Sequence, residues 1–202
     1  MSLYRRLVVP RLIDLAIRQK ELQPIRKRVI AAAEGRVLEI GAGSGLNLQH
    51  YPIGVRSVIA VEPSPQLLRL AARRRRIAPV PAVFIEGSGE TLPFAPHSID
   101  TVVTTWTLCT IPDVARALTE VRRVLRPGEA LLFVEHGLAS EPGVRRWQDR
   151  LDPLWARLAG GCHLNRPIDR LILAAGFCLE QLRNFRLPGP RTHNFMYEGR
   201  AV

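Results

Sequence analysis

The stretch VLEIGAGSG at residues 37–45 decides the fold of this chain. Its first half is a short apolar run, which is typical of a strand buried inside a parallel sheet. Its second half places Gly41, Gly43 and Gly45 where the backbone can turn sharply and a ligand can approach without meeting a Cβ. Residues 46–51 can then start a helix whose free N–H groups and dipole would face that ligand. The stretch therefore predicts a nucleotide-type pocket.

The glycine spacing and one acid separate two classes of cofactor. A dinucleotide fingerprint has the spacing G-x-G-x-x-G, whereas this chain has G-x-G-x-G. Glu39 stands two residues before the first glycine, and a carboxylate there is unfavourable beside an anionic pyrophosphate. It suits a cation such as S-adenosylmethionine (SAM), whose sulfonium and α-ammonium can each pair with it. We therefore predict SAM as the cofactor, with a plain glycine turn as the structural alternative.

A second acid follows at the end of the next apolar run. Residues 57–62 end in Glu62, about 20 residues after the first glycine, where the ribose hydroxyls of a nucleoside need an acceptor. Pro63, Ser64 and Pro65 come next, with Ser64 placed to cap a helix and Pro65 in its first turn. Glu62 and Pro63 are therefore predicted cofactor residues.

These motifs resemble those of a known superfamily. Glu39 and the three glycines form an E-x-G-x-G-x-G segment that resembles motif I of the class I SAM-dependent methyltransferases. The sequence ALTEVRRVLRPG at residues 117–128 resembles the L-x-E-x-x-R-V-L-R-P-G-G helix and turn of the same superfamily. The resemblance covers residues 36–136 and implies a SAM-dependent methyltransferase.

Two more segments acquire roles from this resemblance. The sequence GSGETLPF at residues 87–94 is similar to the G-D-A-E-x-L-P-F segment that holds the adenine in quinone and sterol methyltransferases. Ser88 replaces the Asp of that pattern, so we expect the backbone of Ser88 and Gly89, with Glu90 beside them, to line the adenine site. In this superfamily the loop after the fourth strand lines the methionine end of SAM, which implies that Thr105 contacts the cofactor.

Strand and helix signals alternate along the chain, which indicates βαβ units. We predict an α/β fold: a Rossmann-like, doubly wound, mostly parallel seven-stranded sheet with an N-terminal helical lid over residues 1–33 and a methyltransferase domain over 34–202. Strands are expected at 36–40, 57–62, 82–86, 99–104, 129–135, 177–184 and 195–201. Helices are expected at 65–76, 114–125, 142–158 with an interruption at Asp152-Pro153, and 167–175.

The N-terminal segment allows two interpretations. It interleaves apolar residues with arginines and contains Pro10, which interrupts or starts a helix. A lid over the cofactor cleft is favoured, and a basic amphipathic stretch on a membrane surface is the alternative. We find no signal peptide and no apolar run near the length of a spanning helix, so we expect a cytoplasmic protein with at most peripheral contact at the inner membrane surface.

The charge and the cysteines limit the partners. The net charge of +11 permits attraction to anionic lipid or nucleic acid. The arginines are spread over the whole chain and no base-reading motif is present, so nucleic acid is not the expected partner. Cys109, Cys162 and Cys178 are scattered, without a disulfide framework or zinc spacing, and no metal site is expected. Cys109 is expected to be a small buried hydrophobe rather than a nucleophile.

A narrower resemblance concerns the methyl acceptor. The segments TLCT at 107–110, FVEH at 133–136 and WQDRLDPLW at 147–155 are similar to the membrane-associated methyltransferase-like family, whose animal members are microsomal alkyl-thiol methyltransferases. The segment GGCHLNR at 160–166 fits that family's G-x-G-C-x-L-x-R pattern in part. The resemblance implies a small, apolar acceptor with a thiol favoured.

A thiol attacks as its thiolate, so a base would assist. His136, just past the fifth strand, is the first candidate for a catalytic base and His163 the second, with a structural hydrogen bond as the alternative role for each. Three other functions stay open at this point: a phospholipid or quinone-type lipid methyltransferase at a membrane surface, an RNA-binding methyltransferase, and a SAM-binding protein without transferase activity. The sequence leaves the oligomeric state open.

Overall fold

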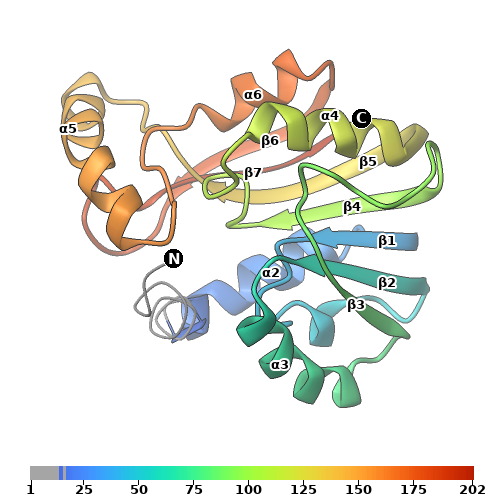
Figure 1. The fold of residues 1–202 in the computed structure, drawn as a ribbon. Helices are drawn as coiled ribbons and strands as arrows, with labels where there is room; N and C mark the ends of the chain where they lie inside the picture. Colours follow the sequence, from blue (N-terminus) through green and yellow to red (C-terminus); the bar gives the residue numbers. More distant parts are fainter. Residues whose placement is uncertain (1–13, 16) are drawn as a thin grey trace.

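The computed structural model describes residues 14, 15 and 17–202. Their core is one seven-stranded sheet in the order β3-β2-β1-β4-β5-β7-β6 (Figure 1). The strands are β1 (Gly35–Ile40), β2 (Val55–Glu62), β3 (Ala82–Glu86), β4 (Ile99–Thr105), β5 (Leu125–His136), β6 (Leu179–Arg186) and β7 (Phe195–Ala201). The first five are parallel, and β7 runs antiparallel to both of its neighbours. The predicted mostly parallel, doubly wound sheet is confirmed.

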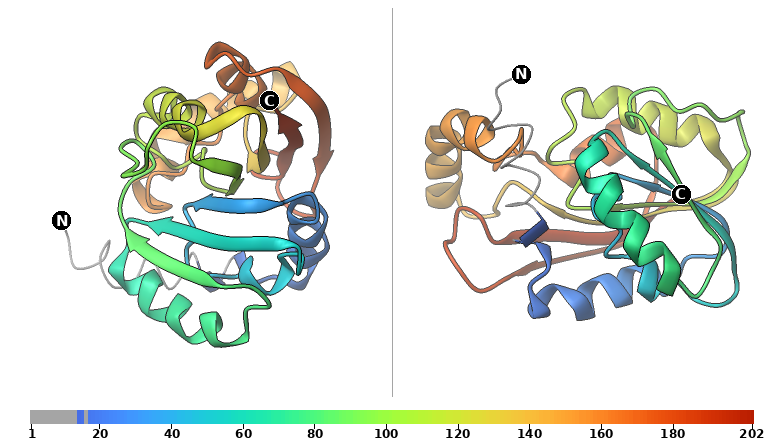
Figure 2. Two further views of the ribbon diagram at one scale, coloured as in Figure 1. Left: turned by 90° about the vertical axis from the view of Figure 1, so that its right-hand side faces the viewer. Right: turned by 60° about the horizontal axis from the view of Figure 1, so that its bottom comes forward.

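Helices cover both faces of this sheet. They are α2 (Gln23–Ile30), α3 (Pro65–Arg74), α4 (Val114–Val124), α5 (Pro142–Leu158) and α6 (Ile168–Ala174), with 3₁₀ turns η2 (Lys20–Leu22), η3 (Leu48–His50) and η4 (Arg75–Ile77). Helices α2 and α3 lie on one face and α4 and α6 on the other (Figure 1 and Figure 2). Each face has its own apolar core, with α2 contributing to one and α4 and α6 to the other. The strand order reverses between β1 and β4, so the carboxyl ends of these strands mark the expected ligand cleft.

Two helix starts follow the predicted capping chemistry. The Ser64 hydroxyl accepts a hydrogen bond from the Leu67 N–H at 3.4 Å, with Pro65 in the first turn of α3. The Asp113 carboxylate accepts from the Arg116 N–H at 3.0 Å at the start of α4. Both caps satisfy N–H groups that have no partner within the helix.

The expected helix after the glycine loop is wrong. Only turns and the three-residue η3 lie between Gly45 and Tyr51. Pro52 disfavours a helical conformation at Tyr51, which adopts extended dihedral angles (φ −63°, ψ 133°). The segment between a glycine at positive φ and this proline is too short for an α-helix, so no helix dipole faces the cleft from here.

Most other predicted boundaries lie within two residues of the observed ones, and two larger differences have a physical cause. Helix α4 ends at Val124, because Leu125 already pairs with Ile99 and starts β5 well before the predicted residue 129. Helix α5 continues through Pro153 instead of breaking there. A proline removes one intrahelical hydrogen bond, and the Asp152 side chain anchors the helix by accepting from the Leu164 N–H at 2.7 Å.

The described part of the N-terminal segment is built into the fold. In α2, Ile25, Val29 and Ile30 are buried against the sheet core that also contains Val134 of β5. Residues 1–13 and 16, on which most of the lid and membrane interpretations depend, lie outside the described residues, so the division at residue 33 stays a prediction. Within residues 14, 15 and 17–202, none of the helices combines the length and the apolar character that crossing a bilayer requires.

Candidate active site

The glycine loop takes a conformation that suits glycine at all three positions. Gly41, Gly43 and Gly45 have φ values of 68°, 56° and 77°, in the left-handed region. A Cβ at Gly41 would also overlap the side chain of Thr107, which approaches the loop from the end of β4. The backbone at Gly41 therefore packs closely against the turn after β4, whereas a Cβ at Gly43 would meet no atom closer than 3.9 Å, so Gly43 is the open position of the loop.

Glu62 fixes this loop to the end of β2. Its Oε2 accepts from the Gly43 N–H and its Oε1 from the Ser64 N–H, both at 2.9 Å. Burial raises the pKa of the Glu62 carboxyl, and the two backbone donors oppose that rise. A buried acceptor thus lies at the predicted ribose position next to Pro63, although direct contact of either residue with the cofactor stays a prediction.

Glu39 is the centre of a buried polar network. Its carboxylate accepts from Asn47 Nδ2 at 2.9 Å and from the Tyr51 hydroxyl at 2.8 Å. Burial raises the pKa of Glu39 to about 7, against the opposing effects of Tyr51, the nearby Arg26 cation and Asn47. The carboxylate is held by these donors beneath the glycine loop, where a cationic ligand would favour its ionised form.

Thr105 joins the same network from β4. Its hydroxyl accepts from Asn47 Nδ2 at 3.0 Å and from Arg26 Nη1 at 3.3 Å. Arg26 also donates to Asn47 Oδ1 at 2.6 Å and lies 4.7 Å from the centre of the Trp106 ring. Sequence reasoning missed Arg26, Asn47 and Tyr51. The one available signal was an arginine on the otherwise apolar, buried side of α2.

The start of the described chain lies against the glycine loop. The Ser44 hydroxyl donates to the Asp14 carboxylate, and Arg74 of α3 donates to the Ser44 carbonyl oxygen at 2.5 Å. A Cβ at Gly43 would stand 3.9 Å from Ile17 Cδ1. These contacts agree with a segment that covers the loop, and its role as a lid stays a prediction.

The predicted adenine segment is held by its own side chains. The Ser88 hydroxyl donates to Glu90 Oε2 at 2.8 Å, and Glu90 Oε1 accepts from the Asp113 N–H at 2.7 Å at the start of α4. A Cβ at Gly89 would stand 2.8 Å from Ile40 Cγ2, so this glycine packs closely on β1. These hydrogen bonds occupy the Glu90 carboxylate. The backbone of Ser88 and Gly89 is therefore the part of the segment that we expect to contact the adenine ring.

A second group of reactive side chains gathers beyond β4 and β5. Cys109, His136 and Cys162 each offer one ligand atom, and these atoms lie within 4.8 Å of one another. The two Sγ atoms are 3.7 Å apart, and the Cys162 Sγ is 3.8 Å from His136 Nδ1. The cysteines are 53 residues apart in the chain. A search for the short spacings typical of zinc ligands therefore could not detect this cluster.

The cluster is buried and electrostatically polarised. The hydrogen bond between Cys109 and Cys162, together with burial, raises the pKa of the Cys109 thiol far above the usual range. The same bond, assisted by His136, lowers the pKa of the Cys162 thiol, while burial opposes this. Cys109 is therefore a buried thiol as expected, and its Sγ also lies within weak hydrogen-bonding distance of a second sulfur.

The two histidines predicted as bases differ in their surroundings. His136 is 6% exposed, and its buried Nε2 has no hydrogen-bond partner among the described residues. His163 Nδ1 lies 2.9 Å from the Asp152 carboxylate, and its backbone N–H donates to the Cys109 carbonyl oxygen at 2.8 Å. Only His136 therefore belongs to the cysteine cluster. Catalysis by either residue stays a prediction.

A short turn links this cluster to the glycine loop. The Thr107 hydroxyl donates to the Gly41 carbonyl oxygen at 3.4 Å, and the Thr107 N–H donates to the buried Glu135 carboxyl at 2.8 Å. Cys109 is two residues further on, and Arg166 donates to the carbonyl oxygens of Leu108 and Ile111 at 2.5 and 2.6 Å. Thr107 thus connects the glycine loop to the turn that carries Cys109.

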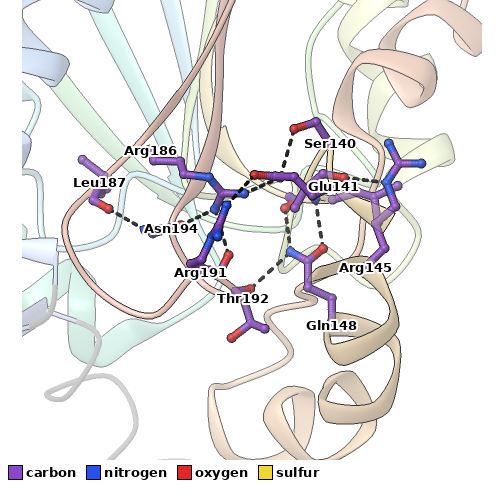
Figure 3. Close-up of polar contacts among 12 residues, drawn as sticks. Ser140, Glu141, Arg145, Gln148, Arg186, Leu187, Arg191, Thr192 and Asn194 are labelled. Carbon is purple, nitrogen blue, oxygen red and sulfur yellow. Dashed lines mark hydrogen bonds and ion pairs between the residues drawn. The ribbon is translucent and has the colours of Figure 1, made fainter. Parts of the chain in front are cut away.

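Helix α5 and the β6–β7 connection support the cluster from outside. Gln148 is fully buried; its Oε1 accepts from the Ala139 N–H at 2.9 Å, and its Nε2 donates to the carbonyl oxygens of Gly137, Leu164 and Thr192 (Figure 3). Glu141 pairs with Arg186 and Arg191 across the same interface. Helix α5 therefore fixes, through Gln148, the segments that follow His136 and Cys162 in the chain.

The raised pKa of Glu39 predicts a pH-dependent stability. A carboxyl whose pKa is higher in the folded state binds its proton more tightly when folded, so the free energy of unfolding falls as pH rises from about 4.5 to about 7. The expected fall is about 3 kcal/mol. Glu39→Gln should remove it in urea unfolding followed from pH 4.5 to 7.5, whereas Tyr51→Phe, which removes a donor to the carboxylate, should extend it to higher pH. A constant difference between wild type and Glu39→Gln would contradict this assignment.

Comparisons with known proteins show the family of this chain. The chain matches the family model described as a methyltransferase domain over residues 38–133. It is 36% identical over 159 residues to human thiol S-methyltransferase TMT1A, covering 75% of this chain and 64% of that protein. It is 38% identical over 157 residues to rat thiol S-methyltransferase TMT1B, covering 74% and 62%. The chain thus spans under two thirds of the length of these relatives. It also shares its fold with YcgJ of Bacillus subtilis, with a TM-score of 0.64, 18% identity and coverage of 90% and 94%.

Proposed function

The chain belongs to the class I SAM-dependent methyltransferases, and we propose that it transfers the methyl group of SAM to the sulfur of a small, apolar thiol. The observation that carries the acceptor is the buried Cys109–His136–Cys162 cluster, which lies one turn away from the glycine loop. The names of the two thiol S-methyltransferases support the same acceptor class.

The residues present fit SAM as the cofactor. A Cβ at Gly43 would meet no atom closer than 3.9 Å, which leaves room for a ligand at that point of the loop, and two buried carboxylates, Glu39 and Glu62, suit a ligand that is cationic and carries hydroxyl groups. Glu62 would hold the ribose, the backbone of Ser88 and Gly89 the base, and the network of Glu39 and Thr105 the methionine end. When bound, SAM supplies a methyl group that its sulfonium has already activated for displacement.

The protein then has to align and deprotonate the acceptor. A thiol reacts as the thiolate, and a positioned base contributes about 10²–10⁴-fold. His136 is the first candidate because its imidazole is buried in the cluster with Nε2 free of protein partners within the described chain. His163, held by Asp152, is the second.

An acceptor screen tests this function. Purified protein is given SAM with a methyl label and, separately, an alkyl thiol, a phenol, a primary amine or phospholipid vesicles. We expect turnover on the thiol, and we expect His136→Gln to lower kcat on it by about a hundredfold. Cys178→Ser, which changes an exposed cysteine outside the cluster, is the matched control. Turnover on the other acceptors without turnover on the thiol would contradict the proposal.

Methylation of a lipid at a membrane surface is the second candidate, and one feature of α5 favours it. Its apolar residues repeat at helical spacing and are exposed, and arginines lie among them: Trp147, Leu151, Leu154 and Leu158, with Arg146, Arg150 and Arg157. Such a basic amphipathic helix can lie on anionic lipid. Figure 1 shows α5 beyond the carboxyl end of β5, on the acceptor side. Turnover on the vesicle phospholipid in the same screen would select this candidate.

A further inference from the structure

We propose that Cys109, Cys162 and His136 bind one Zn²⁺ ion. The three side chains come from three parts of the chain: the turn after β4, the loop after α5 and the last residue of β5. Their ligand atoms nevertheless lie within 4.8 Å of one another. Two thiols and an imidazole form a donor set that zinc prefers, and a Cys₂His set with a fourth, exchangeable ligand is a known form of zinc site.

The distances fit a tetrahedral ion. With Zn–S bonds of about 2.3 Å, two sulfurs on a tetrahedral zinc stand about 3.8 Å apart, and with a Zn–N bond of about 2.0–2.1 Å a sulfur and a nitrogen stand about 3.6 Å apart. The observed separations are 3.7 Å between the sulfurs and 3.8 Å between Cys162 Sγ and His136 Nδ1. Two of the three separations therefore match a tetrahedral ion, and the third, between Cys109 Sγ and the His136 ring, lies within 4.8 Å.

A disulfide explains these positions less well. The sulfurs are 3.7 Å apart, whereas a disulfide bond is about 2.05 Å long, so oxidation would require the two side chains to move closer together. Both cysteines are free thiols in this structure. His136 also has no part in a disulfide, yet its Nδ1 lies 3.8 Å from the Cys162 Sγ.

We assign the fourth coordination position of the zinc ion to the acceptor thiol, an assignment that rests on the proposed function. An acceptor thiol that binds there breaks its S–H bond, donates its electron pair to the ion and releases the proton to solvent. The bound sulfur would then be a thiolate at neutral pH. In the zinc-bound enzyme His136 is a ligand, and the ion rather than the imidazole stabilises the thiolate.

Cobalt substitution tests the site without using methyl transfer. Reduced protein is stripped with a chelator, dialysed and titrated with Co²⁺. We expect one equivalent to give a near-ultraviolet thiolate charge-transfer band and the visible bands of tetrahedral cobalt, both removed by one equivalent of Zn²⁺. Cys109→Ser, Cys162→Ser and His136→Gln should each weaken cobalt binding at least tenfold, and the control Cys178→Ser should not. Binding of S-adenosylhomocysteine to each variant checks that it is folded.

Two results would overturn the proposal. One is the absence of tetrahedral bands in folded, reduced wild-type protein, and the other is their persistence in folded Cys162→Ser. Neither depends on turnover, so both are distinguishable from a failure of the proposed function. In the cobalt-loaded enzyme, an alkyl thiol that is methylated should also shift the charge-transfer band. Methylation of the thiol without such a shift would overturn the role of the fourth position.

Discussion

Replacing Glu62 with alanine is expected to weaken the binding of S-adenosylhomocysteine by more than tenfold. The carboxylate is a buried, charged acceptor at the end of β2, and hydrogen bonds to charged groups are worth about 1.5–3 kcal/mol. The substitution also removes the partner of the Gly43 and Ser64 N–H groups, so the glycine loop loses its attachment to β2. Isothermal titration of the variant with S-adenosylhomocysteine measures the loss directly.

Glu86→Ala is the matched control for this experiment. Glu86 is the residue paired with Glu62 in the register of β2 and β3, and it ends its strand in the same way. Its side chain is exposed, so its removal should leave the affinity within about twofold of wild type. Equal affinity of wild type and Glu62→Ala would show that the cofactor does not depend on this acid.

Gly41→Ala is expected to abolish detectable cofactor binding and to lower the free energy of unfolding by about 2–4 kcal/mol. An alanine at φ 68° is strained, and its Cβ would displace the stiff, β-branched side chain of Thr107. Thr107 precedes Cys109 by two residues, so the displacement would also disturb the acceptor side. Urea unfolding and the same titration measure the two effects.

Gly143→Ala is the control for Gly41→Ala. It shows what an added methyl group does to stability and binding where there is space for it. Gly143 lies in the first turn of α5, and a Cβ there meets no atom within 4 Å. Alanine is favoured over glycine in a helix by about 0.5–1 kcal/mol, so this variant should be as stable as wild type or slightly more stable and should bind normally. If Gly41→Ala behaved in the same way, the glycine loop would not be the cofactor site.

The features that the sequence predicted correctly are those set by neighbouring residues. A run such as 37–40 becomes a buried strand because three of its four side chains are apolar, and Ser64 caps α3 because the cap acts within one helical turn. The motifs around Glu39 and Glu62 are equally local, and the superfamily that they predicted is confirmed by the matched family model and by the thiol S-methyltransferase relatives.

The features that the sequence did not predict depend on tertiary contacts. No α-helix follows the glycine loop. The Tyr51 hydroxyl donates a hydrogen bond to Glu39, and Tyr51 adopts the extended conformation that Pro52 favours. Arg26 reaches the same network only because α2 packs over the sheet.

The cysteine cluster is the clearest example of such a contact. Cys109 and Cys162 meet because the turn after β4 and the loop after α5 both end over the carboxyl edge of the sheet. Side chains hold these loops by bonding to backbone groups, Gln148 at Leu164 and Arg166 at Leu108 and Ile111, and a sequence pattern cannot reveal such bonds.

Isothermal titration of the wild-type chain with S-adenosylhomocysteine tests the central claim most directly, because the fold, the glycine loop and the two buried acids all meet at the cofactor. We expect saturable binding with one site per chain, weakened more than tenfold by Glu62→Ala and unaffected by Glu86→Ala. Absence of binding by folded wild-type protein would contradict the assignment of the glycine loop and of the methyltransferase function built on it.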